Sequence, residues 1–250
     1  MPKDYKFIQL LLNLQSGASQ NVSASKMKTY KILYIHGMGG GEDSRIPSIL
    51  NQHINSYINA DEIHIDVVVR TYDIDPEIAG RQIASWREEL QPPLVIGESL
   101  GSLHAIRLKD VPHLFVSPAV GAARWMATAS YIPGASWLMH RIFQPRPGNR
   151  QILDFSHRVL KHYRGMRDAV LDCSPSRGGS GYFFAFFGTE DSYRRSGVVS
   201  VRSWARHFGR DSYMTYNGTH YMEEEFLYSL LIPKILSVLG ISEGPGTLVR

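Results

Sequence analysis

The sequence has little of several features that mark particular classes of protein. It contains one cysteine, Cys173, so no disulfide can form within the chain. This fits a reducing compartment, and we expect a cytoplasmic protein. No apolar run is long enough to span a membrane. The formal net charge of +4 is too small to indicate nucleic-acid binding. No cluster of carboxylates and histidines has the spacing of a metal site, so we expect neither a metal nor another cofactor.

The composition is that of an ordinary globular protein. Hydrophobic residues make up 43% and charged residues 20% of a chain of 250 residues, which is enough for one domain with a full core. Residues 15–26 are small and polar, so we expect residues 1–26 to form a flexible leader. A weak export signal is the alternative for the short apolar stretch 7–14. The domain itself is expected to span residues 27–250.

Strand-like and helix-like stretches alternate along the chain from residue 30 to residue 239. Short apolar or β-branched runs predict strands, at 30–35, 63–70, 94–96, 113–117, 182–187 and 212–216. Amphipathic stretches predict helices, among them 45–53, 76–90, 154–164, 198–208 and 223–239. Crossover helices make such a sheet parallel and cover both of its faces. The sequence therefore predicts a three-layer α/β/α sandwich with a mostly parallel sheet of about six strands.

Residues 121–180 break this alternation. They contain Trp125, Trp137 and several prolines, and we expect them to form a helical lid inserted into the domain. Basic residues outnumber Asp154, Asp168 and Asp172 in this range, and they are Arg124, Arg141, Arg146, Arg150, Arg158, Lys161, Arg164, Arg167 and Arg177. A solvated basic surface is the ordinary interpretation. A lid that favours anionic substrates or an acidic partner is the alternative.

The most informative stretch is 94–109, where a short strand meets Gly97-Glu98-Ser99-Leu100-Gly101 and a helix-like segment follows. A sharp strand-to-helix turn with serine at its apex and glycine two residues to either side is typical of a nucleophile elbow. The glycines allow neighbouring backbone to approach without a clash at Cβ. The alternative is a glycine-rich turn that binds a phosphate at a helix N-terminus.

Three other loops with reactive side chains also follow predicted strands. They are the glycine loop that begins at His36, the turn that contains Asp191 and the loop that contains His220. In a parallel α/β sheet the sites lie beyond the carboxyl ends of the strands. We therefore expect these loops and Ser99 to open onto one edge of the sheet.

Together the loops offer the parts of an acyl-transfer site. Histidine can remove the proton from a serine hydroxyl, and a carboxylate on its other ring nitrogen fixes the tautomer. The chain order Ser99, Asp191, His220 supplies nucleophile, acid and base. Attack on an acyl carbon also creates an oxyanion that needs fixed donors. We expect these donors to be the backbone N–H groups of Leu100 and Met38.

The segments H-G-M-G, G-E-S-L-G, G-T-E-D and G-T-H, in this order among the predicted elements, resemble those of the α/β-hydrolase superfamily. The chain looks most like the small bacterial esterase-like members, over about residues 30–240. The resemblance implies an esterase in which Ser99, His220 and Asp191 form a catalytic triad. It implies that the backbone N–H groups of Met38 and Leu100 bind the oxyanion. Met38 lies in the glycine loop, where its neighbours Gly37 and Gly39 leave the backbone bare, and Leu100 directly follows the serine. The usual first two strands have no counterpart before residue 30, so the sheet is expected to be trimmed.

Alternatives remain for several of these residues. Glu190 competes with Asp191, which could equally cap a helix. His36 is expected to order the glycine loop, His104 to be structural and Glu98 to pack in the pocket wall. The reaction could be hydrolysis of a small carboxylic ester, acyl transfer or thioester cleavage on the same triad, and a non-catalytic binding protein on a hydrolase scaffold is the third possibility. The expected partner is a small-molecule ester, and the sequence gives no oligomeric state.

Overall fold

The computed structural model describes residues 27–144 and 147–242, so the expected leader at 1–26 lies outside the described residues. These residues form a six-stranded sheet in the order β2-β1-β3-β4-β5-β6, with every neighbouring pair parallel. The strands are β1 (Lys28–Ile35), β2 (Ile63–Val69), β3 (Val95–Glu98), β4 (His113–Val116), β5 (Phe183–Gly188) and β6 (Tyr213–Tyr216). The expected number and direction of strands are confirmed.

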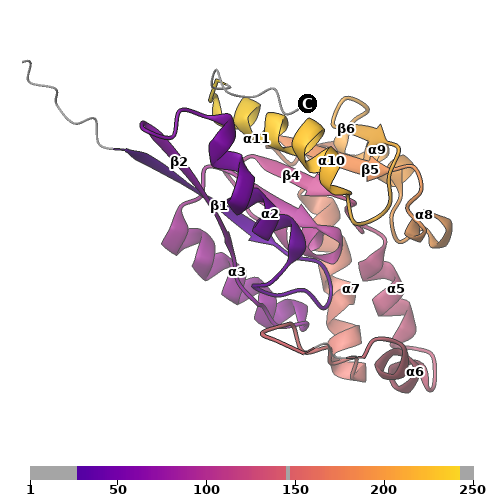
Figure 1. The fold of residues 1–250 in the computed structure, drawn as a ribbon. Coiled ribbons are helices and arrows are strands. Elements are labelled where there is room, and N and C mark those ends of the chain that lie inside the picture. The colour runs from indigo at the N-terminus through magenta and orange to yellow at the C-terminus, as the bar shows by residue number, and fades with distance from the viewer. Residues whose placement is uncertain (1–26, 145–146, 243–250) are drawn as a thin grey trace, which may run out of the picture.

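Helices cover both faces of the sheet (Figure 1). On one face lie α3 (Pro76–Leu90), α4 (Ser102–Ala105), α7 (His157–Asp172) and α9 (Val201–Phe208), and on the other lie α2 (Arg45–His53) and α11 (Ile232–Leu239). The strands divide their side chains between the two layers because successive residues point to opposite faces. In β1, for example, Leu33 and Ile35 join one buried cluster while Ile32 and Tyr34 join the other. The three-layer α/β/α prediction is therefore confirmed.

The strand order reverses between β1 and β3. From β1 the chain passes through α2 to β2 at one edge, and α3 then carries it across to β3 on the other side of β1. Asp75 is the N-cap of α3, since its carboxylate accepts the backbone N–H of Glu77 at 3.0 Å. A crevice forms where the connections diverge, beyond the carboxyl ends of the strands. The loops that follow β1 and β3 both line the cavity at this edge of the sheet.

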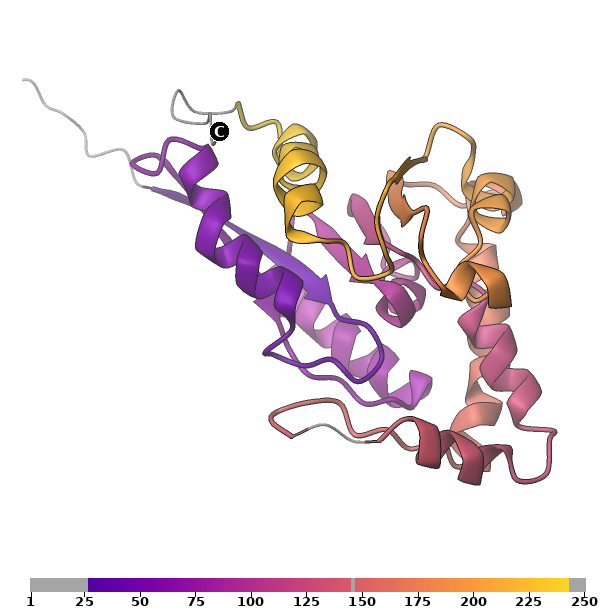
Figure 2. The same ribbon diagram turned by 45° about the vertical axis from the view of Figure 1, so that its right-hand side comes forward.

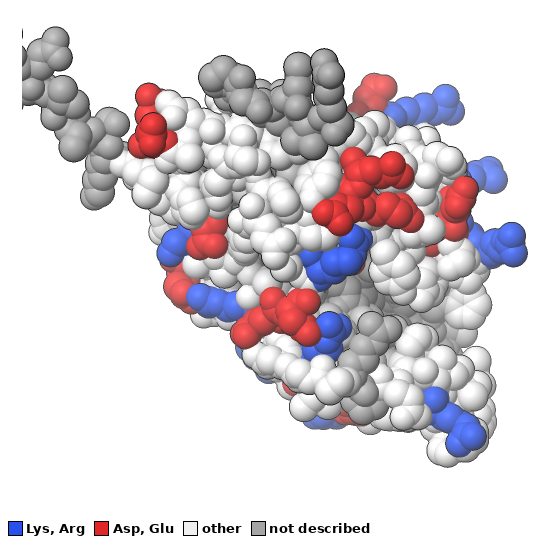
Figure 3. Space-filling view, viewed as in Figure 1, with Lys and Arg blue, Asp and Glu red and all other residues white. Residues whose placement is uncertain are grey.

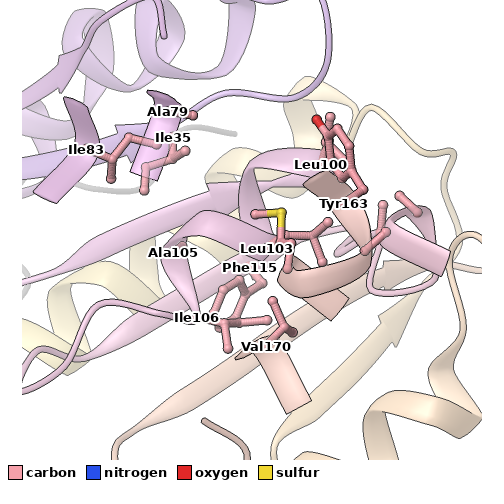
Figure 4. Close-up of a cluster of buried hydrophobic side chains, with 14 of the residues drawn as sticks. Ile35, Ala79, Ile83, Leu100, Leu103, Ala105, Ile106, Phe115, Tyr163 and Val170 are labelled. Atoms are coloured by element: carbon pink, nitrogen blue, oxygen red, sulfur yellow. The ribbon is translucent and has the colours of Figure 1, made fainter. Parts of the chain in front are cut away.

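The range 121–180, expected to be a lid, is divided in the structure. It contains α5 (Ala122–Ala129), α6 (Ala135–Ile142), α7 and a 3₁₀ turn at Pro175–Arg177. The α7 side chains Tyr163 and Val170 are buried with Phe115 of β4 and Leu103 of α4, as Figure 4 shows. Burying one large apolar side chain stabilises the fold by roughly 1.5–3 kcal/mol. Because α7 buries several such side chains, it belongs to the core and connects β4 to β5 as a crossover helix. The α6 helix, in contrast, buries none of its residues fully and lies at the tip of the molecule (Figure 2).

Other boundaries also differ from the sequence interpretation. The helix expected at 154–164 begins later, because Ser156 caps it by accepting the Val159 N–H. It also runs further, to Asp172. The helix after Ser99 is short, a 3₁₀ turn at Ser99–Gly101 followed by α4. The closing helix is made of α10 (Glu224–Phe226), a π-helical turn at Leu227–Leu231 and α11, and it ends at Gly240, which has φ +67°. Among the described residues, none of the helices is long and apolar enough to cross a membrane.

Candidate active site

Ser99 stands at the carboxyl end of β3 in a left-handed backbone conformation, with φ +48°. The two glycines around it are required by close backbone packing. A Cβ on Gly101 would lie 2.3 Å from the carbonyl oxygens of both Ile35 and His36, and one on Gly97 would lie 2.9 Å from the Ala105 Cβ. A positive φ at a non-glycine residue is strained, and such strain concentrates at functional sites. The tight packing thus holds the Ser99 side chain away from the sheet.

A chain of two hydrogen bonds joins three side chains that are remote in sequence. His220 Nδ1 lies 2.7 Å from Asp191 Oδ2, and His220 Nε2 lies 2.8 Å from Ser99 Oγ. A carboxylate can only accept, so the Nδ1 nitrogen carries the imidazole proton in this pair. The Nε2 nitrogen is then free to accept the Ser99 hydroxyl proton. Asp191 and His220 are both buried, which shields this chain from water.

Asp191, and not its neighbour Glu190, contacts the histidine. The Glu190 side chain is exposed to solvent, whereas Asp191 is 3% exposed. Its Oδ1 atom also accepts the backbone N–H of Tyr193 at 2.8 Å at the start of α8 (Tyr193–Ser196), which leaves Oδ2 for His220. Asp191 therefore contacts both the backbone at the start of α8 and the histidine, although Ser192 and not Asp191 is the N-cap of that helix.

The loop that contains His220 is fixed by contacts on both sides of the histidine. The Glu223 carboxylate accepts the Thr219 N–H at 2.9 Å. The Arg45 guanidinium donates to the carbonyls of Tyr221 and, at 2.6 Å, of Met222. This role of Arg45 could not be predicted from the sequence, because a lone arginine at the start of a helix carries no signal of such a contact.

The glycine loop after β1 lies beside the serine. An added Cβ on Gly37 would lie 3.1 Å from the Ser99 Cβ, so this backbone runs against the serine side chain. Met38 and Leu100 both line the cavity in front of Ser99. The Gly39 N–H, in contrast, donates to Gln151 Oε1 at 3.0 Å and is not available to a ligand. Within the described part of the chain, the backbone N–H groups of Met38 and Leu100 have no hydrogen-bond acceptor.

Gln151 is a site residue that sequence reasoning missed. It is 2% exposed and has every polar group of its amide engaged. Besides accepting from Gly39, it donates from Nε2 to the Tyr72 carbonyl at 3.2 Å, and its backbone N–H donates to the Gly40 carbonyl at 2.8 Å. The residue lies in an irregular segment between α6 and α7, where no periodicity marks a glutamine as buried.

Other polar residues near the serine have supporting positions. The buried His36 ring donates from Nδ1 to the Gly37 carbonyl at 2.7 Å and stacks on Tyr72 with a centroid distance of 4.3 Å. Burial lowers the pKa of His36 to about 4 and that of His104 to about 3, so both rings are neutral near pH 7. Glu98 accepts the Tyr34 hydroxyl at 2.8 Å, and burial raises the pKa of its carboxyl group.

A cavity of about 830 Å³ opens in front of Ser99 and His220. Its walls come from the glycine loop, the start of α2, the serine turn, α5 and α6. Apolar side chains predominate on the α5–α6 side, and they are Ala122, Trp125, Met126, Ala129, Ile132, Leu138, Met139, Ile142 and Phe143. A volume of this size is typical of a site for a small organic molecule.

Charged side chains border the opposite side of the cavity, and Figure 3 shows a hollow between acidic and basic side chains on this face. Arg150 pairs with Asp43 at 2.8 Å, and Arg45 donates to two backbone carbonyls. Both guanidinium groups are thus already engaged by the protein. Of the basic residues of the range 121–180, Arg150 lines this cavity, and Asp43 engages it, so selection of an anionic substrate by this range stays a prediction.

Comparison with known proteins gives a likeness in structure only. No protein-family model and no curated protein matches the chain. Among solved structures, a thioesterase domain from the curacin biosynthetic pathway aligns with a TM-score of 0.50 and 14% identity, over 85% of this chain and 92% of that one. An esterase of Pyrococcus furiosus aligns with a TM-score of 0.46 and 14% identity, over 85% of this chain and 82% of that one.

A third structure, an alpha/beta hydrolase family protein from Desulfitobacterium hafniense, aligns with a TM-score of 0.43 and 15% identity over 84% of this chain and 98% of that one. At these identities the likeness concerns the fold. The chain has an α/β-hydrolase fold, and the comparisons show nothing beyond the fold. Its reaction has to be argued from the site.

Proposed function

We propose that the chain is a serine hydrolase that cleaves a small carboxylic ester through an acyl-enzyme. Ser99 is the nucleophile, His220 the general base and Asp191 the acid that orients it. The backbone N–H groups of Met38 and Leu100 form the oxyanion hole. In this proposal α5 and α6 act as the lid over the bound substrate.

The reaction proceeds in two halves. The Ser99 oxygen attacks the acyl carbon while His220 Nε2 takes the hydroxyl proton, and the oxyanion is stabilised by the two N–H groups. Collapse of this intermediate breaks the bond to the alcohol, which leaves with the proton from His220. Water then attacks the acyl-enzyme with His220 again as the base, and release of the acid restores the Ser99 hydroxyl.

The observation that carries the proposal is the hydrogen-bond chain from Asp191 through His220 to a serine in a strained backbone conformation. The imidazole contacts are 2.7 and 2.8 Å long. A serine that merely packed in a turn would not need a buried histidine whose other nitrogen is held by a buried carboxylate. The apolar cavity beside it can accept the acyl part of an ester.

The test compares the wild-type protein with Ser99→Ala on short p-nitrophenyl esters and with a fluorophosphonate probe. We expect the wild type to turn over the esters and to be labelled once, at the peptide that contains Ser99. Replacement of the nucleophile should lower the rate by about 10³-fold or more. Ser102→Ala is the matched control, because Ser102 is a buried neighbour whose hydroxyl donates to the Gly97 carbonyl. Full labelling of Ser99→Ala would remove the serine from this role.

A further inference from the structure

The lid carries an unusual amount of exposed apolar surface. Most of the large apolar side chains that are exposed in the described residues lie on α5, on α6 or on the turn between them. We call this surface the α5–α6 apolar face, and its members are Trp125, Tyr131, Ile132, Trp137, Leu138 and Ile142, each at least half exposed. Scattered exposed apolar residues are normal, but a contiguous group marks an interaction site.

The exposure is not the result of a poorly attached helix. On its inner side, α6 packs through Met139 and Phe143 against the core cluster. His140 accepts the backbone N–H of Phe155 at 3.1 Å and lies edge-on to the Phe155 ring. These contacts fix which side of α6 faces outward. Trp137 is the most exposed member of the face, at 68%.

The α5–α6 apolar face is continuous with the cavity. Four of its members, Trp125, Ile132, Leu138 and Ile142, also line the cavity in front of Ser99. Tyr131 and Trp137 are not part of the cavity lining and extend the same surface outward. An apolar path therefore leads from the outer surface of the lid to the serine.

The charged side chains on α5 and α6 themselves are basic, and the acid beside them is Asp154, whose Oδ1 lies 3.8 Å from His140 Nε2. Residues 111–153 contain no Asp or Glu, whereas Arg124 and Arg141 lie on α5 and α6 and are exposed. Within the described residues neither of these two guanidinium groups forms an ion pair with a carboxylate. The Arg141 guanidinium lies over the Trp137 ring at 5.9 Å from its centroid. In Figure 3 the surface over α6 is largely uncharged, with basic side chains near its tip.

We propose that the α5–α6 apolar face docks on an anionic lipid surface. Aromatic and aliphatic side chains enter the boundary between head groups and acyl chains, and Arg124 and Arg141 remain at the level of the phosphates. A second copy of this chain would bring its own exposed Arg124 and Arg141 to the same surface, so the charges favour an anionic lipid surface over self-association. Docking goes beyond the proposed hydrolase and does not require it. Where the hydrolase holds, docking turns the cavity mouth toward acyl chains in the lipid.

The experiment measures binding of the full chain with the Ser99→Ala substitution to vesicles, so that hydrolysis cannot alter the lipid. Vesicles of phosphatidylcholine alone are compared with vesicles containing one third phosphatidylglycerol. We expect at least tenfold tighter partitioning to the anionic vesicles at low salt, weakening as salt is added. Tryptophan emission should shift to shorter wavelength on binding, because Trp125 and Trp137 leave water.

Two further substitutions in the same background locate the surface. Trp137→Ser should weaken partitioning about tenfold or more, because it removes the most exposed apolar side chain of the face. Arg141→Gln should weaken it about fivefold on anionic vesicles only. Tyr182→Ser is the matched control: Tyr182 is an exposed aromatic residue beside the amino end of β5, and its replacement should leave partitioning unchanged.

Several results would overturn the proposal. They are no binding by the Ser99→Ala protein to anionic vesicles, equal binding to both vesicle types, and equal weakening by Trp137→Ser and Tyr182→Ser. A dimer in size-exclusion chromatography that Trp137→Ser dissociates, without vesicle binding, would assign the face to a second copy. None of these results bears on ester turnover by the wild-type protein, so failure of docking is distinguished from failure of the proposed hydrolase.

Discussion

At the scale of single residues, Asp191 has two tasks that use different oxygen atoms. Oδ1 accepts the N–H of Tyr193, the first residue of α8, while Oδ2 accepts from His220 Nδ1. An asparagine could keep the first contact, because its carbonyl oxygen also accepts. At the histidine, however, asparagine would present an amide N–H in place of a carboxylate oxygen or would favour the tautomer with its proton on Nε2. In either case His220 Nε2 is no longer held ready to accept the Ser99 proton.

We therefore predict that Asp191→Asn lowers kcat for ester cleavage by about 10³- to 10⁴-fold while the free energy of unfolding changes by less than about 1 kcal/mol. Glu190→Gln is the matched control, since Glu190 is exposed and adjacent, and it should change kcat less than twofold. Steady-state kinetics and urea unfolding of both variants check this. Equal losses in the two variants would contradict the assignment of the acid.

Gly101 is a residue at which packing, and not conformational freedom, requires glycine. A Cβ there would lie 2.3 Å from two backbone carbonyl oxygens of β1 and the loop after it, and backbone cannot move aside as a side chain can. Gly165 in the middle of α7 offers the opposite case, because a Cβ at that position meets nothing within 4 Å.

The second prediction compares these two glycines. Gly101→Ala should destabilise the fold by about 2 kcal/mol or more, because the serine turn must separate from β1. Gly165→Ala should stabilise it by about 0.5–1 kcal/mol, since alanine is the better helix former and Gly165 has room for it. Chemical denaturation monitored by far-UV circular dichroism measures both. A Gly101→Ala protein as stable as the wild type would show that the turn is not tightly packed against β1.

At the scale of elements, the segment between α6 and α7 holds the glycine loop in place. Residues 149–151 form an antiparallel bridge between Arg150 and Gly41, and Gln151 bonds the backbone of Gly39 and Gly40. The chain that leaves the lid is thus attached directly to the loop expected to supply one oxyanion donor. Gln151 touches no substrate in this arrangement and acts as a positioning residue.

We predict that Gln151→Ala lowers kcat for ester cleavage about 10- to 100-fold with little change in KM. An oxyanion donor that is displaced loses an interaction made only in the transition state. Gln151→Glu should recover little, since a carboxylate can accept from Gly39 but cannot donate to the Tyr72 carbonyl. Asn149→Ala is the control at the exposed end of the segment, where the side chain donates to Glu42, and should change kcat less than twofold. A rise in KM alone in Gln151→Ala would contradict the positioning role.

The elements that the sequence predicted well are those with a clear period or a boundary signal. The strand at Lys28–Ile35 and the helix from Pro76 to Leu90 follow from an apolar run and from the Asp75-Pro76 start. The order of Ser99, Asp191 and His220 after their strands let the sequence place these residues at one edge. Their roles remain predictions until kinetics test them.

The elements that the sequence predicted poorly depend on contacts between remote segments. The division of 121–180 into core helix α7 and exposed helix α6 depends on which amphipathic face finds the sheet, and amphipathicity alone does not indicate this. The contact of Gln151 with Gly39 spans 112 residues along the chain. Such contacts leave no periodic signal in the sequence, because only the folded chain brings the partners together.

At the scale of the whole molecule, the interior holds several ionisable rings. Besides His220, the histidines His36, His104 and His113 are buried, and they lie at the sheet or in the short helix beside it. Burial is the main cause that lowers the pKa of each ring, to about 4 for His36 and His113 and about 3 for His104. The folded protein therefore holds all three as neutral rings under conditions in which the unfolded chain would protonate them.

The sign of the effect on stability follows from proton binding. Between the unfolded pKa of about 6.5 and the lowered folded values, the unfolded chain binds more protons than the folded one, so acid favours unfolding. Stability is full above pH 6.5 and decreases as the pH falls toward 4. At pH 5 each of these histidines lowers the free energy of unfolding by roughly 2 kcal/mol relative to its value above pH 6.5. Three such losses are comparable with the whole stability of a typical domain, so the molecule should be acid-labile well above the pH at which carboxylates are protonated.

We accordingly predict that the free energy of unfolding measured in urea decreases by several kcal/mol between pH 7.5 and pH 5. His104→Leu should reduce that decrease by roughly 2 kcal/mol, because within the described residues both nitrogens of the ring are buried without a hydrogen-bond partner, and leucine has no proton to gain. His64→Gln, at an exposed position on β2, is the matched control and should leave the pH dependence unchanged. Equal slopes for the wild type and His104→Leu would mean that the His104 ring is hydrated in the folded protein, and the acid sensitivity would then have to arise elsewhere.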